Sequence, residues 1–228
     1  MSFAPFLAEA AANGLAERVA ASGLEFDRAL DLDPLSHAKR TALNRCALSW
    51  SEAFLGEGET VRCSGSGYGL ATSVLGLQVV NDLPGVLVQL RRLLAPDGML
   101  AMALVGGESL RELRAAIAAA ETEHWGGASP RVAPLVDVRD LGNLMQRAGF
   151  KKVVTDAERT TAQYSSFEAL VRDLRANALT NTLASRNRRP LSRAVRDSTV
   201  AHYRQSHAAK AGGLCATFDI IYGVGYAP

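Results

Sequence analysis

The sequence has little cysteine, little net charge and no long hydrophobic run, and each shortage excludes a class of protein. Its 228 residues include three cysteines, Cys46, Cys63 and Cys215, which lie far apart and form no CxxC motif. This spacing predicts neither a disulfide framework nor a metal cluster. The longest uninterrupted apolar run, Met99 to Val105, is far shorter than the roughly 20 residues that span a membrane.

The charges nearly cancel, with 25 basic against 23 acidic residues. A net charge of +2 gives no general attraction to nucleic acid or to a membrane surface. The first residues carry Glu9 and no basic start, which is a poor signal peptide. Together with the sparse cysteines, this favours a reducing compartment, and we expect a cytoplasmic protein.

No glycine-rich turn follows the predicted first strand. Residues 28–32 (RALDL) are typical of the first strand of a nucleotide-binding sheet, which a glycine-rich turn follows. Here the next residues are Asp33, Pro34, Leu35 and Ser36. Pro34 lacks an N–H donor, and the other side chains occupy space that a close approach of ligand to backbone requires.

What is present is an alternation of helical and strand patterns. A helical stripe recurs every four residues at Leu7, Ala11, Leu15 and Val19. The strongest pattern predicts a helix over 83–94, a turn at 96–98, a buried strand over 99–105, and a helix over 108–123 after Gly106-Gly107. This order is an α/β crossover unit.

Weaker patterns complete the expected fold. They predict helical structure over 35–55, short strands at 26–32 and 60–63, an apolar run over 70–75, helices over 137–148, 167–178 and 191–208, and strands over 152–161 and 217–225. We expect one domain, 1–228, with residues 163–213 as a helical insertion before the last strand.

Several stretches between residues 80 and 226 carry a family resemblance. The segments VNDLP (80–84), GGESLRELR (106–114), RAGF (147–150), NALTN (177–181) and ATFDIIYGVGY (216–226) resemble class I S-adenosylmethionine-dependent methyltransferases. The nearer branch holds the malonyl-carrier-protein methyltransferase of biotin synthesis and the methyltransferase-fold complex I assembly factor that acts as an arginine hydroxylase. The likeness implies an α/β, Rossmann-like methyltransferase fold with a mostly parallel seven-stranded sheet, helices on both faces and a C-terminal antiparallel hairpin.

The spacing departs from this family between the first strand and the fourth. Residues 34–67 number 34, whereas two strands and three crossovers need roughly 40 or more. We therefore predict that one strand-helix unit is lacking within residues 34–67. No clear acid for the end of the second strand follows, because Glu52, Glu57 and Glu59 are all poorly placed for it.

The resemblance implies S-adenosylmethionine as cofactor, and the residues expected to bind it are Asp31, Asp33, Ser73 and Leu77. Asp31 binds either the amino end of that cofactor or a neighbouring backbone N–H. The loop 64–69 (SGSGYG) is either an anion cradle or a flexible connection. No catalytic residue is assigned, because methyl transfer needs alignment more than acid–base groups.

Substrate-pocket candidates follow the predicted strands at the sheet edge where ligands bind in open α/β folds, namely Asn81, Asp82, Gly106, Gly107 and Glu108. Asp82 is equally an N-cap for the helix over 83–94, and Glu108 equally favours a helix N-terminus by its charge. His124 is expected at a helix C-terminus. His202 and His207 do not share a helix face, so no metal site is predicted.

One basic cluster stands out, formed by Arg186, Arg188, Arg189, Arg193 and Arg196. It is either a solvated surface or a docking site for an acidic protein, and nucleic acid is the weaker partner because no aromatic platform accompanies it.

Two functions remain open. One is a methyltransferase with a degenerate cofactor-binding half and a small, carrier-bound or protein-bound acceptor. The other is a non-catalytic interaction or assembly factor, for example in respiratory complex assembly.

Overall fold

The computed structural model describes residues 4–32, 42–176, 179–181, 186–208 and 213–228. The helices are α1 (Ala4–Ala21), α3 (Leu83–Leu93), α4 (Arg111–Trp125), α5 (Val138–Arg147), α6 (Phe167–Ala176) and α7 (Arg193–His207). The strands are β1 (Arg28–Leu32), β2 (Ser49–Leu55), β3 (Val61–Arg62), β4 (Tyr68–Val74), β5 (Leu94–Gly106), β6 (Lys151–Tyr164) and β7 (Leu214–Tyr226). Short 3-10 turns occur at Asn44–Cys46, Glu57–Glu59 and Leu77–Val79.

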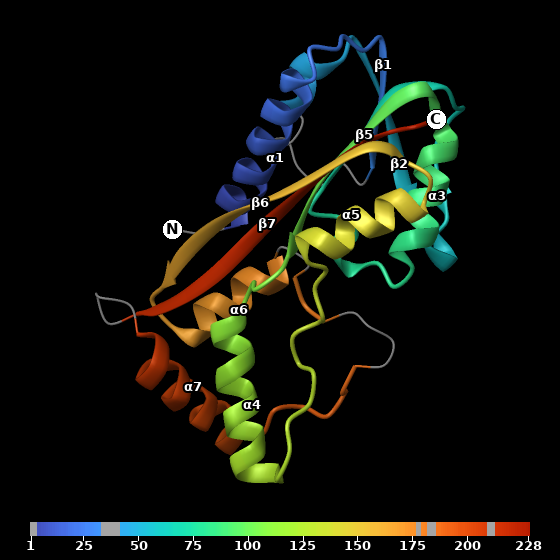
Figure 1. The fold of residues 1–228 in the computed structure, drawn as a ribbon. Helices are drawn as coiled ribbons and strands as arrows, with labels where there is room; N and C mark the ends of the chain where they lie inside the picture. Colours follow the sequence, from blue (N-terminus) through green and yellow to red (C-terminus); the bar gives the residue numbers. More distant parts are fainter. Residues whose placement is uncertain (1–3, 33–41, 177–178, 182–185, 209–212) are drawn as a thin grey trace. The chain divides into compact units, whose positions relative to one another are not determined.

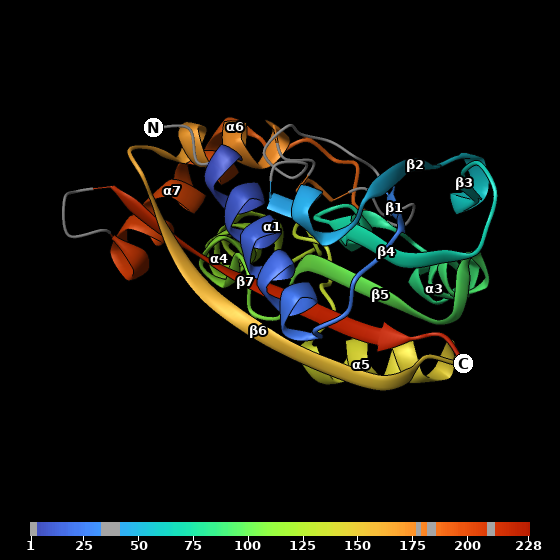
Figure 2. The same cartoon turned by 90° about the horizontal axis from the view of Figure 1, so that it is seen from above.

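The seven strands form one sheet in the order β3-β2-β1-β4-β5-β7-β6. Strand β1 pairs in parallel with β2 and β4, and β4 pairs in parallel with β5. Strand β7 points opposite to β4 and β5 and lies beside β6, antiparallel to it, although α6 and α7 separate the two strands in the chain (Figures 1 and 2). The expected α/β fold, with a mostly parallel sheet and antiparallel strands at the C-terminus, is confirmed.

The prediction of a lacking strand was wrong, because the sheet contains all seven. The short segment between β1 and β4 is accommodated because β3 is only two residues long. β3 pairs antiparallel with β2, with Phe54 opposite Arg62. Only residues 56–60 connect the two strands, and they form a 3-10 turn rather than a helix. A hairpin needs a few residues where a parallel crossover needs about 10 to 12, so the second crossover helix is replaced.

The chain divides into two compact units. The first contains Met1–Ala4, Glu108–Leu135 and Arg159–Asp219, and the second contains Pro5–Gly107, Val136–Glu158 and Ile220–Pro228. Among the described residues, no helix combines the length and apolar character needed to cross a membrane.

In the second unit, helices cover both faces of the sheet: α1 lies on one face, and α3 and α5 on the other (Figures 1 and 2). The predicted stripe of α1 is confirmed, since Leu7, Ala11, Leu15 and Val19 are all buried. The opposite face buries a core that includes Leu30, Leu32, Ala71, Leu87, Leu90, Met102, Leu141 and Ile221. Alternate residues of β1 therefore face two different environments, as strand geometry requires.

Arg18 fixes α1 to the sheet within the second unit. Its guanidinium bonds to the carboxylates of Asp156 and Glu158 on β6 and stacks over the Tyr222 ring at 3.6 Å. Gly14, one turn earlier, gives the close approach that this stacking needs, because a Cβ there would lie 2.2 Å from the Tyr222 hydroxyl. The hydrogen bond that Arg18 donates to Asp156, opposed by burial, raises the pKa of Arg18, which therefore stays charged at any physiological pH.

In the first unit, Asp219 of β7 holds the turn before α4. Its carboxylate accepts two hydrogen bonds from Arg159, at 2.7 and 2.9 Å, and one from the Glu108 backbone N–H. Ser109 donates to the Asp219 carbonyl and accepts from its N–H. The hydrogen bonds from Arg159, opposed by burial, lower the pKa of Asp219.

This lowered pKa predicts a dependence of stability on pH. A carboxyl with a lower pKa in the folded state stabilises the fold above its unfolded pKa, and the contribution is lost as pH falls through the folded value. We expect the free energy of unfolding to fall steadily below about pH 4, with a shallower fall in Asp219→Asn. Denaturant unfolding measured from pH 7 to pH 2 tests this, with Asp97→Asn, at an exposed position near the start of β5, as the matched control. Equal slopes in the two variants would refute the assignment.

Candidate cofactor site at the β1–β2 edge

Asp31 is the fourth residue of β1 and lines a pocket of about 360 Å³. Its neighbour on β2 is Glu52 and its neighbour on β4 is Thr72, both directly opposite in register. Thr72 donates a hydrogen bond of 3.1 Å to the Asp31 carboxylate. Paired residues of adjacent strands share a sheet face, so this rung presents two carboxylates side by side.

The other residues of this pocket are Leu43, Asn44 and Trp50. Trp50 pairs with Ala29 on β1, two residues before Glu52 on the same strand face. Its indole Nε1–H is buried and has no hydrogen-bond partner among the described residues. A buried donor without a partner costs about 1–3 kcal/mol, so such a group commonly awaits a water or ligand acceptor.

Two of the predicted cofactor residues do not line this pocket. Ser73 and Leu77 are fully buried, with Leu77 in the core beside α3, although the Ser73 hydroxyl also lacks a partner among the described residues. Asp33 lies outside the described residues, as do Pro34, Leu35 and Ser36. Of the predicted set that the structure describes, Asp31 alone lines the pocket.

Asn81 and Asp82 are occupied in holding the turn between β2 and β3. The Glu59 carboxylate accepts from the Asn81 N–H, the Asn81 side-chain amide and the Asp82 N–H, at 2.6 to 2.9 Å. Burial favours the neutral acid, but these hydrogen bonds prevail and lower the pKa of Glu59. Asp82 caps α3 by accepting from Gly85 N–H at 2.9 Å, which confirms its capping role.

Gly106, Gly107 and Glu108 also have structural partners. A Cβ on Gly106 would lie 2.4 Å from both the Val136 carbonyl oxygen and the Ile221 side chain, so glycine is needed there for packing. Gly107 has a φ of 56° and donates to Val136. Glu108 is exposed, and its N–H donates to Asp219.

Glu52 and Trp50 are residues that sequence reasoning passed over. Residues 49–55 were expected to be helical, yet they form β2, and this strand brings Glu52 beside Asp31. A strand with one exposed face is normally recognised by alternating apolar and polar residues. β2 buries only Ala53 fully, so its sequence shows no clear alternation. The description of Glu52 as poorly placed was therefore based on a wrong element.

The chain matches the methyltransferase domain family over residues 11–155. It belongs to that family. It is 36% identical over 161 residues to the arginine-hydroxylase NDUFAF5, mitochondrial, of Danio rerio, covering 71% of this chain and 50% of the relative. It is 35% identical over 156 residues to the malonyl-[acyl-carrier protein] O-methyltransferase of Laribacter hongkongensis, covering 68% and 50%. The chain thus spans about half the length of these curated relatives.

Solved structures agree with the methyltransferase fold. The YcgJ protein of Bacillus subtilis superposes with a TM-score of 0.59 at 8% identity, covering 93% of this chain and 97% of that one. A putative methyltransferase of Bacillus halodurans superposes with a TM-score of 0.59 at 10% identity, covering 94% and 98%. At such low identity, these similarities show the fold alone.

Proposed function

We propose that this methyltransferase-family chain binds S-adenosylmethionine in the pocket at Asp31 and transfers its methyl group to a small, carrier-bound or protein-bound acceptor. The observation that carries the proposal is the rung of Asp31 and Glu52, because it sets two carboxylates beside an indole donor in one pocket. The pocket's volume lies within the roughly 300–1,000 Å³ typical of small-molecule sites.

The described lining fits the chemistry of this cofactor. A carboxylate suits its cationic ammonium or its ribose hydroxyls, and the Trp50 N–H suits a ring-nitrogen acceptor. When bound, the cofactor supplies an electrophilic methyl group. The residues of this chain would then orient the cofactor, since transfer depends on alignment of the acceptor rather than on a general base.

Trp50 provides a direct reporter of binding. The chain has two tryptophans, so Trp125→Phe leaves Trp50 as the only indole. We expect its fluorescence to change on titration with S-adenosylmethionine, and calorimetry on the unmodified chain to give the same affinity. Asp31→Asn should weaken binding about tenfold or more, because it removes a charge-assisted contact. The exposed Glu57→Gln is the matched control.

The alternative function is a non-catalytic interaction or assembly factor. The hairpin that replaces a crossover between β2 and β3 favours it, because part of the cofactor-binding half is reduced. Folded protein would be titrated with millimolar S-adenosylmethionine. If neither calorimetric heat nor a change in Trp50 fluorescence is observed, the catalytic proposal is wrong and the non-catalytic function is supported.

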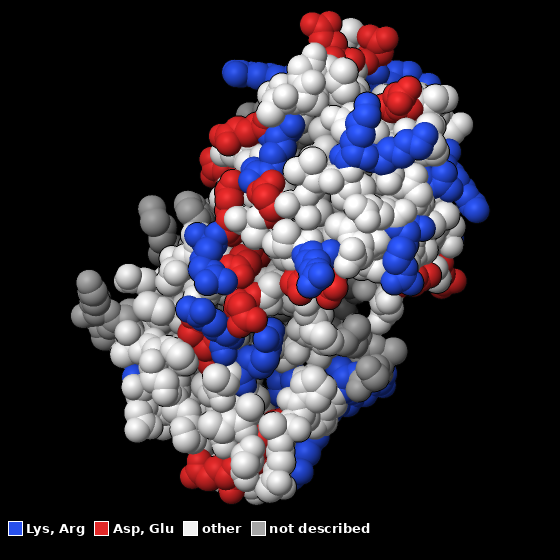
Figure 3. Space-filling model, viewed as in Figure 1, with Lys and Arg blue, Asp and Glu red and all other residues white. Residues whose placement is uncertain are grey.

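We also propose a cytoplasmic location. A further proposal is that an acidic protein partner docks at the basic cluster of Arg186, Arg188, Arg189 and Arg193. Within this cluster, the Arg189 guanidinium stacks over Trp125 at 3.9 Å, and Arg131 donates to the Asn187 and Arg189 carbonyl oxygens. Arg188 and Arg193 are exposed and stay available to a partner. Figure 3 shows acidic and basic side chains interspersed on one face, which argues against broad attraction to polyanions.

A further inference from the structure

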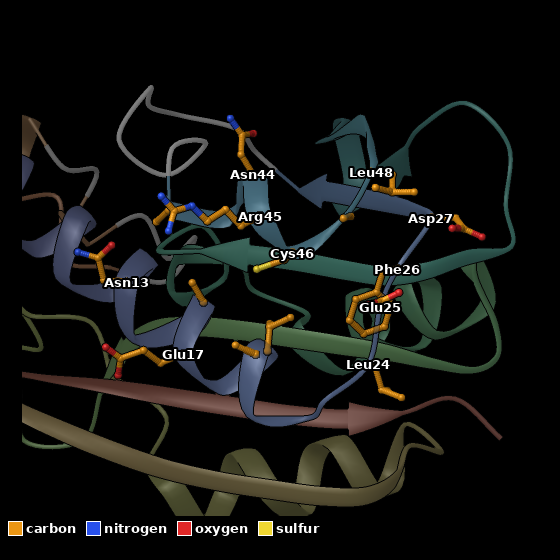
Figure 4. A pocket seen from close by; sticks show the side chains of 15 residues that line it. Asn13, Glu17, Leu24, Glu25, Phe26, Asp27, Asn44, Arg45, Cys46 and Leu48 are labelled. Atoms are coloured by element: carbon orange, nitrogen blue, oxygen red, sulfur yellow. The ribbon is translucent and has the colours of Figure 1, made fainter.

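A second, larger pocket of about 920 Å³ lies in the second unit, at the amino ends of β1 and β2. Three segments line it: the C-terminal half of α1, residues 24–27 before β1, and residues 42–48 before β2 (Figure 4). Asn44 borders both pockets, but their other lining residues are distinct. Open α/β sheets bind their cofactor at the opposite, carboxyl edge, so this pocket needs an explanation of its own.

The pocket combines a buried apolar floor with exposed apolar side chains. Val19 of α1 and Phe26 are buried, whereas Leu24 is 48% exposed and Leu48 is 87% exposed. Both leucines belong to the lining, as Figure 4 shows. Single exposed leucines are ordinary, but two beside a concave apolar floor offer surface to a hydrocarbon.

The charged residues of the lining have one predominant sign. Glu17, Glu25 and Asp27 are acidic and exposed, and among the described lining residues Arg45 is the one base. None of the three acidic side chains forms an ion pair or side-chain hydrogen bond with another described residue. A chain with a net charge of +2 thus carries a locally negative pocket, and low-dielectric walls strengthen such a field.

We propose that this pocket binds an organic cation with an apolar body, such as an alkylammonium compound. Phe26, Leu24 and Leu48 would contact the hydrocarbon, and the carboxylates of Glu17, Glu25 and Asp27 would attract the charge. A metal ion is the wrong cation, because the described residues contain no cluster of three or more metal-ligating side chains. The concave shape and size suit a small molecule rather than a flat protein surface.

Cys46 lines the pocket and gives a readout without a catalytic assay. In the double variant Cys63→Ser/Cys215→Ser, Cys46 is the only thiol, and its rate of modification reports occupancy. The probes are octyltrimethylammonium and octanesulfonate below their micellar concentrations, which have the same chain length and opposite charge. We expect the cation to protect Cys46 at about tenfold lower concentration than the anion, and less so at 1 M salt.

The variant Glu17→Gln/Glu25→Gln/Asp27→Asn should abolish that preference, and Leu48→Ser should weaken both probes. All four residues are exposed, so these variants are expected to fold. Calorimetry with the unmodified chain gives a second measurement free of cysteine changes, and Asp31→Asn should leave it unchanged. Equal protection by cation and anion, or a preference that survives the triple variant, would overturn the proposal.

Discussion

Replacing Gly106 with alanine is expected to cost about 3 kcal/mol of unfolding free energy. The new Cβ would lie 2.4 Å from both the Val136 carbonyl oxygen and the Ile221 side chain. The Ile221 methyl can turn aside, but the carbonyl belongs to backbone that accepts the Gly107 N–H at 2.8 Å. The clash can be relieved only by moving β5 or the segment before α5, both of which pack in the core.

The matched control is Gly127→Ala, because a Cβ on Gly127 meets nothing within 4 Å and its φ is not in the left-handed region. Chemical denaturation of the two variants under identical conditions measures the difference. If Gly106→Ala were as stable as Gly127→Ala, the packing explanation for Gly106 would be wrong. The prediction that Gly106 borders the substrate pocket would then be the better explanation for a glycine at this position.

Glu121→Gln is expected to cost a similar amount, about 3 kcal/mol, by breaking a buried ion pair. The Glu121 side chain is fully buried, and it accepts hydrogen bonds from Arg131 Nε at 2.6 Å, Ser129 N–H at 2.6 Å and Ser129 Oγ at 2.7 Å. Burial raises the pKa of Glu121, but these hydrogen bonds overcome it and hold the value below the ordinary one. Removing the charge leaves the Arg131 guanidinium, whose side chain is only 13% exposed, without its anion.

Glu123→Gln, two residues along α4, is the control for this substitution. Glu123 also accepts hydrogen bonds, from Ser198 and His202, but its side chain is largely exposed and the pair is screened by water. We expect a much smaller loss of stability from Glu123→Gln in the same denaturation experiment. Comparable losses from the two variants would contradict the special role of the buried pair.

The parts of the fold that could be read from the sequence are those with strong local signals. The continuous apolar run at 99–105 is the buried part of β5, and the Asp82 cap begins α3 as predicted. Gly149 has a φ of 92° just after α5, the left-handed conformation that favours glycine at a helix end. These features depend on neighbours in the chain, so they do not require the tertiary structure.

The parts that could not be read depend on pairing between distant segments. β2 is partly exposed, and only its register with β1 shows that Glu52 lies beside Asp31. Chain length correctly signalled a shortage after β1, but it could not distinguish a lost strand from a hairpin that needs few residues. Likewise, Ser73 and Leu77 occupy plausible positions along the chain, and only packing shows that both are inaccessible.

The two-residue length of β3 has a consequence for solution behaviour. Although β3 is the terminal strand on its side of the sheet, it pairs with only Phe54 and Leu55 of β2. The outer margin of β2 from Ser49 to Ala53 therefore has no strand beside it in the part of the chain that the structure describes. Bare margins of this kind recruit further strands and lead to aggregation, so a β3 lengthened to pair along the whole of β2 would protect the molecule from edge-to-edge polymerisation.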